Sequence, residues 1–496
     1  MVWPFRTRPI SIRPPDWSSP RQAALDEPFL LMNRSGLALS HRDMLTRMFL
    51  IGATGSGKTG VLHHVVAAAM RSGYSLLLLT VKPSDTRDYL AIARLCDRAD
   101  VTVFRPETHR FNPVRALIES MGDSPAMIER VVALIMDAVT RLHDGSSGDA
   151  RFWQSRSEKA VAHLVTLAVL AGVTPSFRWI LDALRDRARS PEEAADPAWQ
   201  TTNPVCQAIA RALGAPMTAS QRADLDQAAR WWFADLPRMP VRTVESVIIT
   251  LSGPLSKLVR GPLGEVLNSN ESSWDPASLC HRHGIAIIDA SVQEHGPLGL
   301  SLQRMIKRVF FEQLKTRDLR TGAWPILIVQ DEAQDLLDTE VDADLIRTMR
   351  SRRVATVLAT QTINNLVEAC RDAREAKMYA EAVAALPGIK VMLANTCPES
   401  LHWCERALTS VPTVKLSSGT SDRSDTDPSS SGRSSNRSQN FAIEHAPAVM
   451  AHEIATLRTG GPPNNMIVEA ILSRVGAPFP TGRPHARVAF RQIDLP

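Results

Sequence analysis

The sequence predicts an α/β protein with a largely parallel central sheet, interrupted by an inserted all-helical domain. Two observations support this fold class. Apolar runs without alternation recur with helical stretches between them, as in Ser75–Val81 and Val101–Phe104, which is typical of parallel strands buried on both faces. Such runs vanish between Pro113 and Val241, where apolar residues repeat at helical spacing instead. With 44% hydrophobic and 22% charged residues, the chain has a globular composition.

The strands are expected where short apolar runs are bounded by polar or turn residues. A length of 496 residues is more than one compact domain normally contains, so the strands should belong to a domain that the helical part interrupts. In chain order the predicted strands are Met48–Ile51, Ser75–Val81, Val101–Phe104, Gly284–Asp289, Pro325–Val329, Val354–Leu358, Lys390–Leu393 and Asn465–Ala470.

Two segments are too polar, or too rich in proline and arginine, to belong to a packed domain. The first is the N-terminus, and the second is the serine-rich stretch SSGTSDRSDTDPSSSGRSSNRSQN. We therefore expect an extended arm at residues 1–30, a discontinuous nucleotide-binding domain at 31–114 and 242–496, an inserted all-α domain at 115–241, and a mobile loop at 417–440.

The octapeptide GATGSGKT lies between the apolar run Met48–Ile51 and the helical run Val61–Val66. Strand, glycine-rich loop and helix in this order predict a phosphate-binding loop, because glycines let consecutive backbone N–H groups converge on phosphates. Lys58 is placed to reach the β- and γ-phosphates, and the Thr59 hydroxyl to bind Mg²⁺. The predicted nucleotide-binding residues are Gly52, Ala53, Thr54, Gly55, Ser56, Gly57, Lys58 and Thr59, with ATP and Mg²⁺ as the cofactors.

The apolar strand at Ile326–Val329 is followed by Gln330, Asp331 and Glu332. A parallel strand brings its C-terminal residues to the edge of the sheet where the phosphate loop lies. Asp331 is therefore a candidate Mg²⁺ ligand, and Glu332 a candidate base for the attacking water. An acidic turn exposed to solvent would also give this pattern, but its pairing with a phosphate loop favours hydrolysis.

Two further polar signals each have two interpretations. Gln361 follows the predicted strand at 354–358 and is either a sensor of the γ-phosphate or an ordinary polar strand end. Arg350, Arg352 and Arg353 precede the same strand. They either supply a catalytic arginine across a subunit boundary or form a solvated basic helix end.

The overall charge permits an anionic partner. The net charge is +5 and the pI is about 9.0, and the stretch Ser301–Arg320 carries four arginines and two lysines against two acids. On a helix Arg304, Arg308 and Lys315 would share one face, which is either a contact for nucleic-acid phosphates or a plain solvated face. The six cysteines form no metal-binding spacing and indicate thiols in a reducing compartment.

Neither a signal peptide nor a membrane span is predicted. The first twenty residues contain no apolar core, and no run of about eighteen consecutive apolar residues occurs. We therefore expect a cytoplasmic protein that reaches a membrane only through a partner.

The order of these motifs resembles the type IV secretion coupling proteins of conjugation, the TraG/TraD group, within the FtsK/HerA class of hexameric motor ATPases. The resemblance extends from Leu39 to Pro478. The segments that carry it are GATGSGKT (52–59), LLLLTVKPSD (76–85), RFNPV (110–114), FWQSRSEKA (152–160), TVESVIITLSGPL (243–255), IVQDEAQDL (328–336), RSRRVATVLATQT (350–362), LANTCPES (393–400) and HEIATL (452–457).

The resemblance implies a RecA-like motor domain and sharpens three assignments. Arg350 is similar to the family's intersubunit arginine finger, and Gln361 to its sensor glutamine. The insert at 115–241 resembles the all-helical domain that faces incoming DNA and partner proteins. The function that the resemblance implies is an ATP-hydrolysing DNA translocase, assembled as a hexamer. Its implied partners are DNA, a relaxase or other cargo protein, and the components of a secretion channel.

Two departures from the family leave alternatives open. Membrane-bound relatives carry transmembrane helices before the motor, whereas only the arm at residues 1–30 is expected here. The turn after the second predicted strand reads VKPSD rather than Asp-Pro-Lys-Gly. A soluble DNA-processing ATPase of a mobile element or a defence system is therefore one alternative. Another is an ATP-gated adaptor that recruits protein cargo to a channel. A pump for double-stranded DNA in chromosome segregation lacks support, because no winged-helix segment follows the motor.

Overall fold

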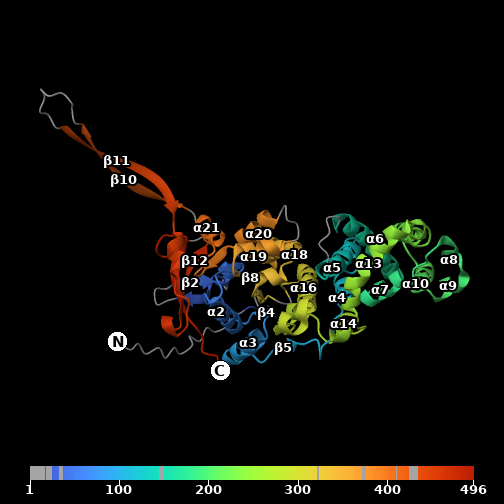
Figure 1. Cartoon of the computed structure of the whole chain (residues 1–496). Coiled ribbons are helices and arrows are strands. Elements are labelled where there is room, and N and C mark those ends of the chain that lie inside the picture. Colours follow the sequence, from blue (N-terminus) through green and yellow to red (C-terminus); the bar gives the residue numbers. More distant parts are fainter. Residues whose placement is uncertain are drawn as a thin grey trace.

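The computed structural model of the chain centres on one large sheet with a helical segment to one side (Figure 1). Most of the predicted N-terminal arm lies outside the described residues. The structure describes residues 17, 25–32, 37–143, 150–320, 323–370, 376–408, 410–423, 434–476 and 478–495.

The central sheet contains nine strands in the described part of the chain. Its first seven strands in sequence, β3 to β9, are parallel to one another, whereas β12 runs antiparallel to both β9 and β13. This arrangement confirms the predicted α/β fold class. The spatial order is β13 (His485–Arg491), β12 (Ile467–Arg474), β9 (Ile389–Met392), β3 (Met48–Ile51), β8 (Val354–Thr360), β7 (Ile326–Gln330), β4 (Ser75–Leu79), β6 (Ile285–Ile288) and β5 (Val101–Phe104).

The strands lack alternation because both faces of the sheet are covered. In β3 every residue is buried, and successive side chains of a strand point to opposite faces. Met48 and Leu50 accordingly belong to the larger hydrophobic core, and Phe49 and Ile51 to the smaller one. The helices that accompany the sheet are α2 (Lys58–Arg71), α3 (Pro83–Leu95), α16 (Val292–Lys315), α17 (Ala333–Leu336), α18 (Thr339–Thr348), η3 (Met349–Arg352), α19 (Ile363–Ala369), α20 (Ala376–Ala385), α21 (Pro398–Ala407), α22 (Ala451–Ala455) and η4 (Pro462–Asn464).

Between β5 and β6 the described chain is helical. These helices form the body at the right of Figure 1, and α4, α5 and α14 pack on α16, which accompanies the sheet. The helices extend past the predicted boundary at 241, because α13 begins at that residue. The elements are α4 (Pro113–Met121), α5 (Met127–Arg141), α6 (Ala150–Leu170), α7 (Phe177–Arg185), α8 (Pro191–Ala195), α9 (Pro197–Thr202), α10 (Pro204–Leu213), α11 (Ala219–Arg230), η2 (Trp231–Asp235), α12 (Leu236–Arg238), α13 (Val241–Leu258), α14 (Gly261–Leu267) and α15 (Ser278–His281).

The N-terminal arm ends earlier than predicted. Strand β1 (Pro28–Met32) pairs with β2 (Leu37–Ser40), which leads into the short helix α1 (His41–Met44). Trp17 is buried, and its Nε1 donates a hydrogen bond to the carbonyl oxygen of Ser72 at 2.8 Å. Residues 28–30 are therefore part of a strand, in which Phe29 and Leu30 are buried in the core.

Residues 417–423 and 434–440 of the predicted mobile loop at 417–440 form strands rather than a loop, while their mobility stays a prediction. They belong to β10 (Ser410–Arg423) and β11 (Ser434–Pro447), which form an antiparallel hairpin that projects from the body (Figure 1). Residues 424–433 lie outside the described part of the chain. Polar side chains misled the prediction because strand pairing uses backbone hydrogen bonds, which a serine-rich sequence can supply without burial.

Candidate active site

The predicted phosphate loop connects the C-terminal end of β3 to the N-terminus of α2. Gly57 immediately precedes α2 with a φ of 94°, a left-handed conformation that favours glycine. A Cβ at this position would lie 2.4 Å from Val468 Cγ2 on β12. The C-terminal strand pair therefore closes against the loop, and glycine is required both by the backbone angle and by this contact.

Lys58 lies under the loop with its side chain buried. Its Nζ donates hydrogen bonds to the carbonyl oxygens of Gly52 at 2.8 Å and Ala53 at 3.2 Å. Burial lowers the pKa of Lys58, whereas the carboxylates of Glu332 and Asp331 raise it. The ammonium group is therefore within electrostatic range of the acidic pair, although the two elements lie far apart in the sequence.

Asp331 and Glu332 follow β7, at the edge of the sheet that carries the phosphate loop. Asp331 is 3% exposed, and burial together with the charges of Asp85 and Glu332 raises its pKa to about 6. Glu332 has a left-handed backbone with a φ of 51°, and its N–H donates to Asp331 Oδ1 at 3.0 Å. A non-glycine residue in this conformation is uncommon and stores strain of the kind found at functional sites.

Three side chains hold the Glu332 carboxylate. Gln361 Nε2 donates to its Oε1 and Oε2 at 3.0 and 3.1 Å, Gln334 Nε2 donates to Oε2 at 3.0 Å, and Lys82 Nζ donates to Oε1 at 3.1 Å. Burial alone would raise the pKa of Glu332, but these hydrogen bonds and the charge of Lys82 lower it. The carboxylate is therefore held ionised, as a general base must be.

Gln361 links the acidic pair to the phosphate loop. It follows β8, the strand that lies between β3 and β7, and its Oε1 accepts a hydrogen bond from Thr54 Oγ1 at 2.9 Å. Asn395 Nδ2 donates to the backbone oxygen of Gln361 at 2.9 Å. One glutamine thus contacts both the loop and Glu332, which a simple polar strand end would not do.

Lys82 was missed as a site residue. Lys82 belongs to the turn VKPSD, between the end of β4 and the start of α3. Asp331 directly follows β7, and β4 and β7 are adjacent parallel strands, so the two residues lie at the same end of the sheet. The backbone N–H of Lys82 donates to Asp85 Oδ2 at 3.1 Å, which fixes the turn. The available signal was a lysine at the C-terminal end of a parallel strand, where charged residues reach the crevice above the sheet.

The residues of the site fit ATP and Mg²⁺. The Ser56 hydroxyl in the loop is buried without a hydrogen-bond partner, and α2 presents its N-terminus to the loop. Like charges on Asp85 and Glu332 act on Asp331, and an oxygen-binding divalent cation would relieve that repulsion. Among the described residues no group of three or more His, Cys, Asp or Glu side chains is arranged to hold a metal ion. Thr59 and Asp331 would therefore need phosphate oxygens and water to complete the Mg²⁺ shell.

Arg350 is not brought to this site within the chain. It lies exposed in η3, before the first residue of β8, whereas Gln361 follows the last. The seven residues of β8 span roughly 20 Å. Arg350 lies before the N-terminal end of this strand and Gln361 after its C-terminal end, so the two residues are on opposite sides of the sheet along the strand direction. Arg353 is buried, and its Nη1 donates to the backbone oxygen of Ala323.

The face predicted for Arg304, Arg308 and Lys315 is buried at Arg304 and Arg308, whereas the Lys315 side chain is 35% exposed. The stretch 301–320, which carries this face, forms most of α16. Arg308 pairs with Asp338 at 2.7 Å and Lys315 with Glu312 at 2.7 Å. The expectation of an open face is wrong for Arg304 and Arg308, because their partners Asp335 and Asp338 come from the segment after β7, which sequence spacing does not reveal.

Comparison with known proteins agrees with this architecture. No protein-family model matches the chain, and no curated protein matches its sequence. Among solved structures, the bacterial conjugative coupling protein TrwBdeltaN70 matches with a TM-score of 0.57 and 15% identity, over 96% of this chain and 90% of that one. The chain has the fold of a conjugative coupling protein.

Two further TrwB structures contain nucleotides. The complex with the non-hydrolysable ATP analogue ADPNP matches with a TM-score of 0.57 and 14% identity, over 94% of this chain and 89% of that one. The complex with ADP and Mg²⁺ matches with a TM-score of 0.57 and 13% identity, over 95% and 92%. The coupling-protein resemblance seen in the motifs is thus confirmed at the level of the fold. In the described residues, no helix combines the length and apolarity needed to span a bilayer.

Proposed function

We propose that the chain is a Mg²⁺-dependent ATPase that couples hydrolysis to the movement of DNA, alone or with an attached protein. One observation carries this proposal above all. A continuous series of hydrogen bonds runs from Thr54 in the phosphate loop through Gln361 to Glu332 and Lys82. A loop that only bound nucleotide would not need an ionised carboxylate held in register with it.

Each residue has a defined task in this proposal. Glu332 accepts the proton of the attacking water, and Gln361 and Lys82 keep its carboxylate ionised and oriented. Lys58 balances charge on the β- and γ-phosphates, while Thr59 and Asp331 hold Mg²⁺, which stabilises the negative charge that develops during transfer. Gln361 also acts as the sensor of the γ-phosphate, because it contacts Thr54 of the phosphate loop.

The position of Arg350 supports the proposal of an oligomer. Because this side chain is exposed at the edge of the sheet opposite to Lys58, it could act only on the site of a neighbouring copy. We propose that copies form a closed ring of six, as the resemblance implies, in which Arg350 completes each site. Subunits with Arg350→Ala should then regain some turnover when mixed with Lys58→Ala subunits, because some interfaces pair an intact Lys58 with an intact Arg350. No rescue in demonstrably mixed oligomers would refute this role.

The catalytic assignment is tested by two variants. Lys58→Ala should lose both tight ATP binding and turnover, because the buried cation at the phosphates is removed. Glu332→Gln should keep ATP binding and lose turnover, because the amide cannot accept the proton. Normal turnover in either purified variant would refute the assignment of these residues.

The DNA-linked function is tested by stimulation. A DNA translocase should show ATP turnover that rises when DNA is added and DNA binding that weakens steeply with salt. An ATP-gated adaptor for a relaxase or another cargo protein would instead respond to the protein partner and not to DNA. Stimulation by DNA without any effect of cargo would also fit a DNA-processing ATPase of a mobile element or defence system.

A further inference from the structure

The short helix α17 follows Glu332 directly, and cations surround its C-terminal end. The backbone oxygens of three successive residues, Asp335, Leu336 and Leu337, each accept a hydrogen bond from a different basic side chain. The last carbonyls of a helix have no partners within it, and basic side chains satisfy them favourably. These three carbonyls are therefore held by side chains from outside the catalytic segment.

Two of the three cations come from α16. Arg304 Nη2 donates to the oxygen of Asp335, and Lys307 Nζ donates to the oxygen of Leu336 at 2.6 Å. Lys307 is fully buried and also donates to Gln330 Oε1 at 2.9 Å and to Asp342 Oδ2 at 2.8 Å. Because Gln330 precedes Asp331, α16 fixes the catalytic turn on both sides.

The third cation comes from the helical segment between β5 and β6. Arg141 is the last residue of α5, and its Nη2 donates to the oxygen of Leu337 at 2.7 Å. Its Nε donates to Asp137 at 2.9 Å, and the side chain is 14% exposed. The planar guanidinium is thus fixed by one bond on its own helix while it makes another to the catalytic segment.

The contact continues in both directions. Within α17, Gln334 donates to Glu332 Oε2 at 3.0 Å, so a displacement of this single helical turn would move a hydrogen-bond donor of the catalytic carboxylate. On the other side, Lys257 of α13 donates to the backbone oxygen of Leu142 at 3.1 Å. A path of polar contacts therefore runs from α13 through the end of α5 and α17 to Glu332.

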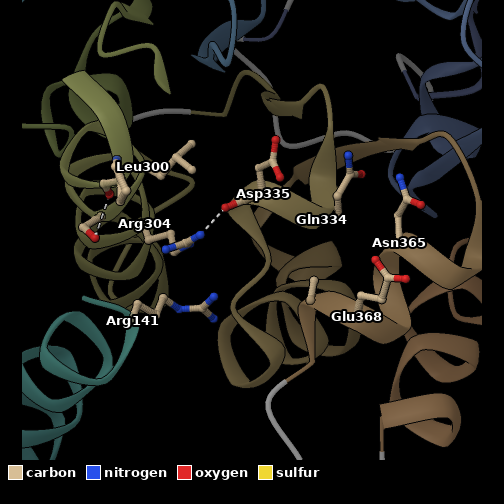
Figure 2. A pocket seen from close by; sticks show the side chains of 10 residues that line it. Arg141, Leu300, Arg304, Gln334, Asp335, Asn365 and Glu368 are labelled. Atoms are coloured by element: carbon tan, nitrogen blue, oxygen red, sulfur yellow. Dashed lines mark hydrogen bonds between the residues drawn. The ribbon is translucent and has the colours of Figure 1, made fainter. Parts of the chain in front are cut away.

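A cavity at this junction gives the contact room to change. It has a volume of about 540 Å³, and Arg141, Arg304, Gln334 and Asn365 are among the side chains that line it. Figure 2 shows Arg141 and Arg304 pointing across it toward the segment that carries Gln334 and Asp335. Arg141 thus makes its hydrogen bonds to Asp137 and Leu337 at the border of this space.

We propose that Arg141 is a positioning residue through which the helical segment controls the placement of Glu332. The inference rests on the proposed function in one respect, that Glu332 is the base. A partner bound to the helical segment would change ATP turnover by moving α5 relative to Leu337. In return, nucleotide bound in the site would change the amide exchange of the last turn of α5.

The first measurement compares turnover in three variants with the wild type. Arg141→Met should lower kcat by about tenfold, the effect expected when one hydrogen bond from a charged group is lost, with KM changed less than about twofold. Arg141→Lys keeps one donor and the charge, so it should recover part of the loss. Arg130→Met is the matched control, because Arg130 also lies on α5 and contacts Glu340 and Glu312 but does not touch α17. It should leave kcat unchanged. Equal losses in Arg141→Met and Arg130→Met would overturn the inference.

The second measurement does not depend on hydrolysis. Amide hydrogen exchange is followed in the phosphate loop, in α17 and in the last turn of α5, with and without AMP-PNP and Mg²⁺. In the wild type and Arg130→Met, the analogue should slow exchange in all three segments. In Arg141→Met and more weakly in Arg141→Lys, the slowing should be confined to the loop and α17.

The outcomes separate the two proposals. If the analogue slows exchange in the loop but the effect on α5 is absent in the wild type, or persists in Arg141→Met, the role of Arg141 is refuted and the proposed function stands. If the analogue fails to slow exchange in the loop of the wild type, nucleotide binding is refuted, and the proposed function and this inference fall together.

Discussion

Lys82→Met should slow ATP turnover without weakening ATP binding. Lys82 Nζ lies 3.1 Å from Glu332 Oε1, with the lysine side chain 44% exposed and the glutamate side chain 8% exposed. A hydrogen bond to a charged group contributes about 1.5–3 kcal/mol when shielded, and an exposed pair about 0–1 kcal/mol. A half-exposed pair should contribute about 1–2 kcal/mol, which corresponds to a fall in kcat of about 5- to 30-fold. The loss is limited because Gln334 and Gln361 still donate to the carboxylate.

The assay is phosphate release at saturating ATP, together with the affinity for a non-hydrolysable analogue. Lys82→Arg should restore most of the turnover, because the guanidinium keeps a charged donor at the same turn. Lys315→Met is the control. Lys315 forms a comparable ion pair with Glu312, with 2.7 Å between Nζ and Oε1, and this pair is not part of the site. A kcat within about twofold of the wild type, or a loss of ATP affinity as large as the loss of turnover, would refute this reasoning.

Three other predictions follow from buried groups. Lys307→Met should lower the free energy of unfolding by about 3 kcal/mol, because Asp342 is left charged and 1% exposed; urea unfolding measures it, and a loss below about 1 kcal/mol would contradict it. Burial lowers the pKa of His41 to about 4, so the unfolded chain, with a pKa near 6.5, binds the proton first. Stability should therefore be complete above pH of about 6.5 and should fall by about 3 kcal/mol on acidification to about pH 4. His41→Gln should flatten this part of the pH dependence, and an unchanged slope would refute the assignment. Gly57→Ala should abolish ATP binding, measured by calorimetry, and a second change of Val468 to Ala should not restore it, because the left-handed φ of 94° remains strained.

The sequence was sufficient for elements whose signal is local. The strands were predictable because burial on both faces leaves an uninterrupted apolar run, as in Ile326–Val329. The phosphate loop was predictable because its glycines are required by backbone geometry within eight residues. The acidic pair was found because it ends a recognisable strand.

The features that sequence reasoning missed depend on contacts between distant residues. Lys82 and Glu332 meet only because β4 and β7 are neighbours in the sheet. The sequence of each strand alone does not indicate which strand lies beside it. Arg308 was expected on a basic face open to solvent or to phosphates, but in the structure it is buried and pairs with Asp338 of the segment after β7. The hairpin β10–β11 was missed because side-chain polarity says little about backbone pairing.

The contact between Val468 and Gly57 has a consequence for the order in which the protein matures. The phosphate loop is translated before the helical segment, whereas its two neighbouring strands β8 and β9, and the strand β12 that closes against Gly57, are translated after it. Chains fold progressively during synthesis, but the contacts around this loop are complete only after β12 has been made. If the loop binds ATP as proposed, a chain released before β12 should therefore show no ATP turnover.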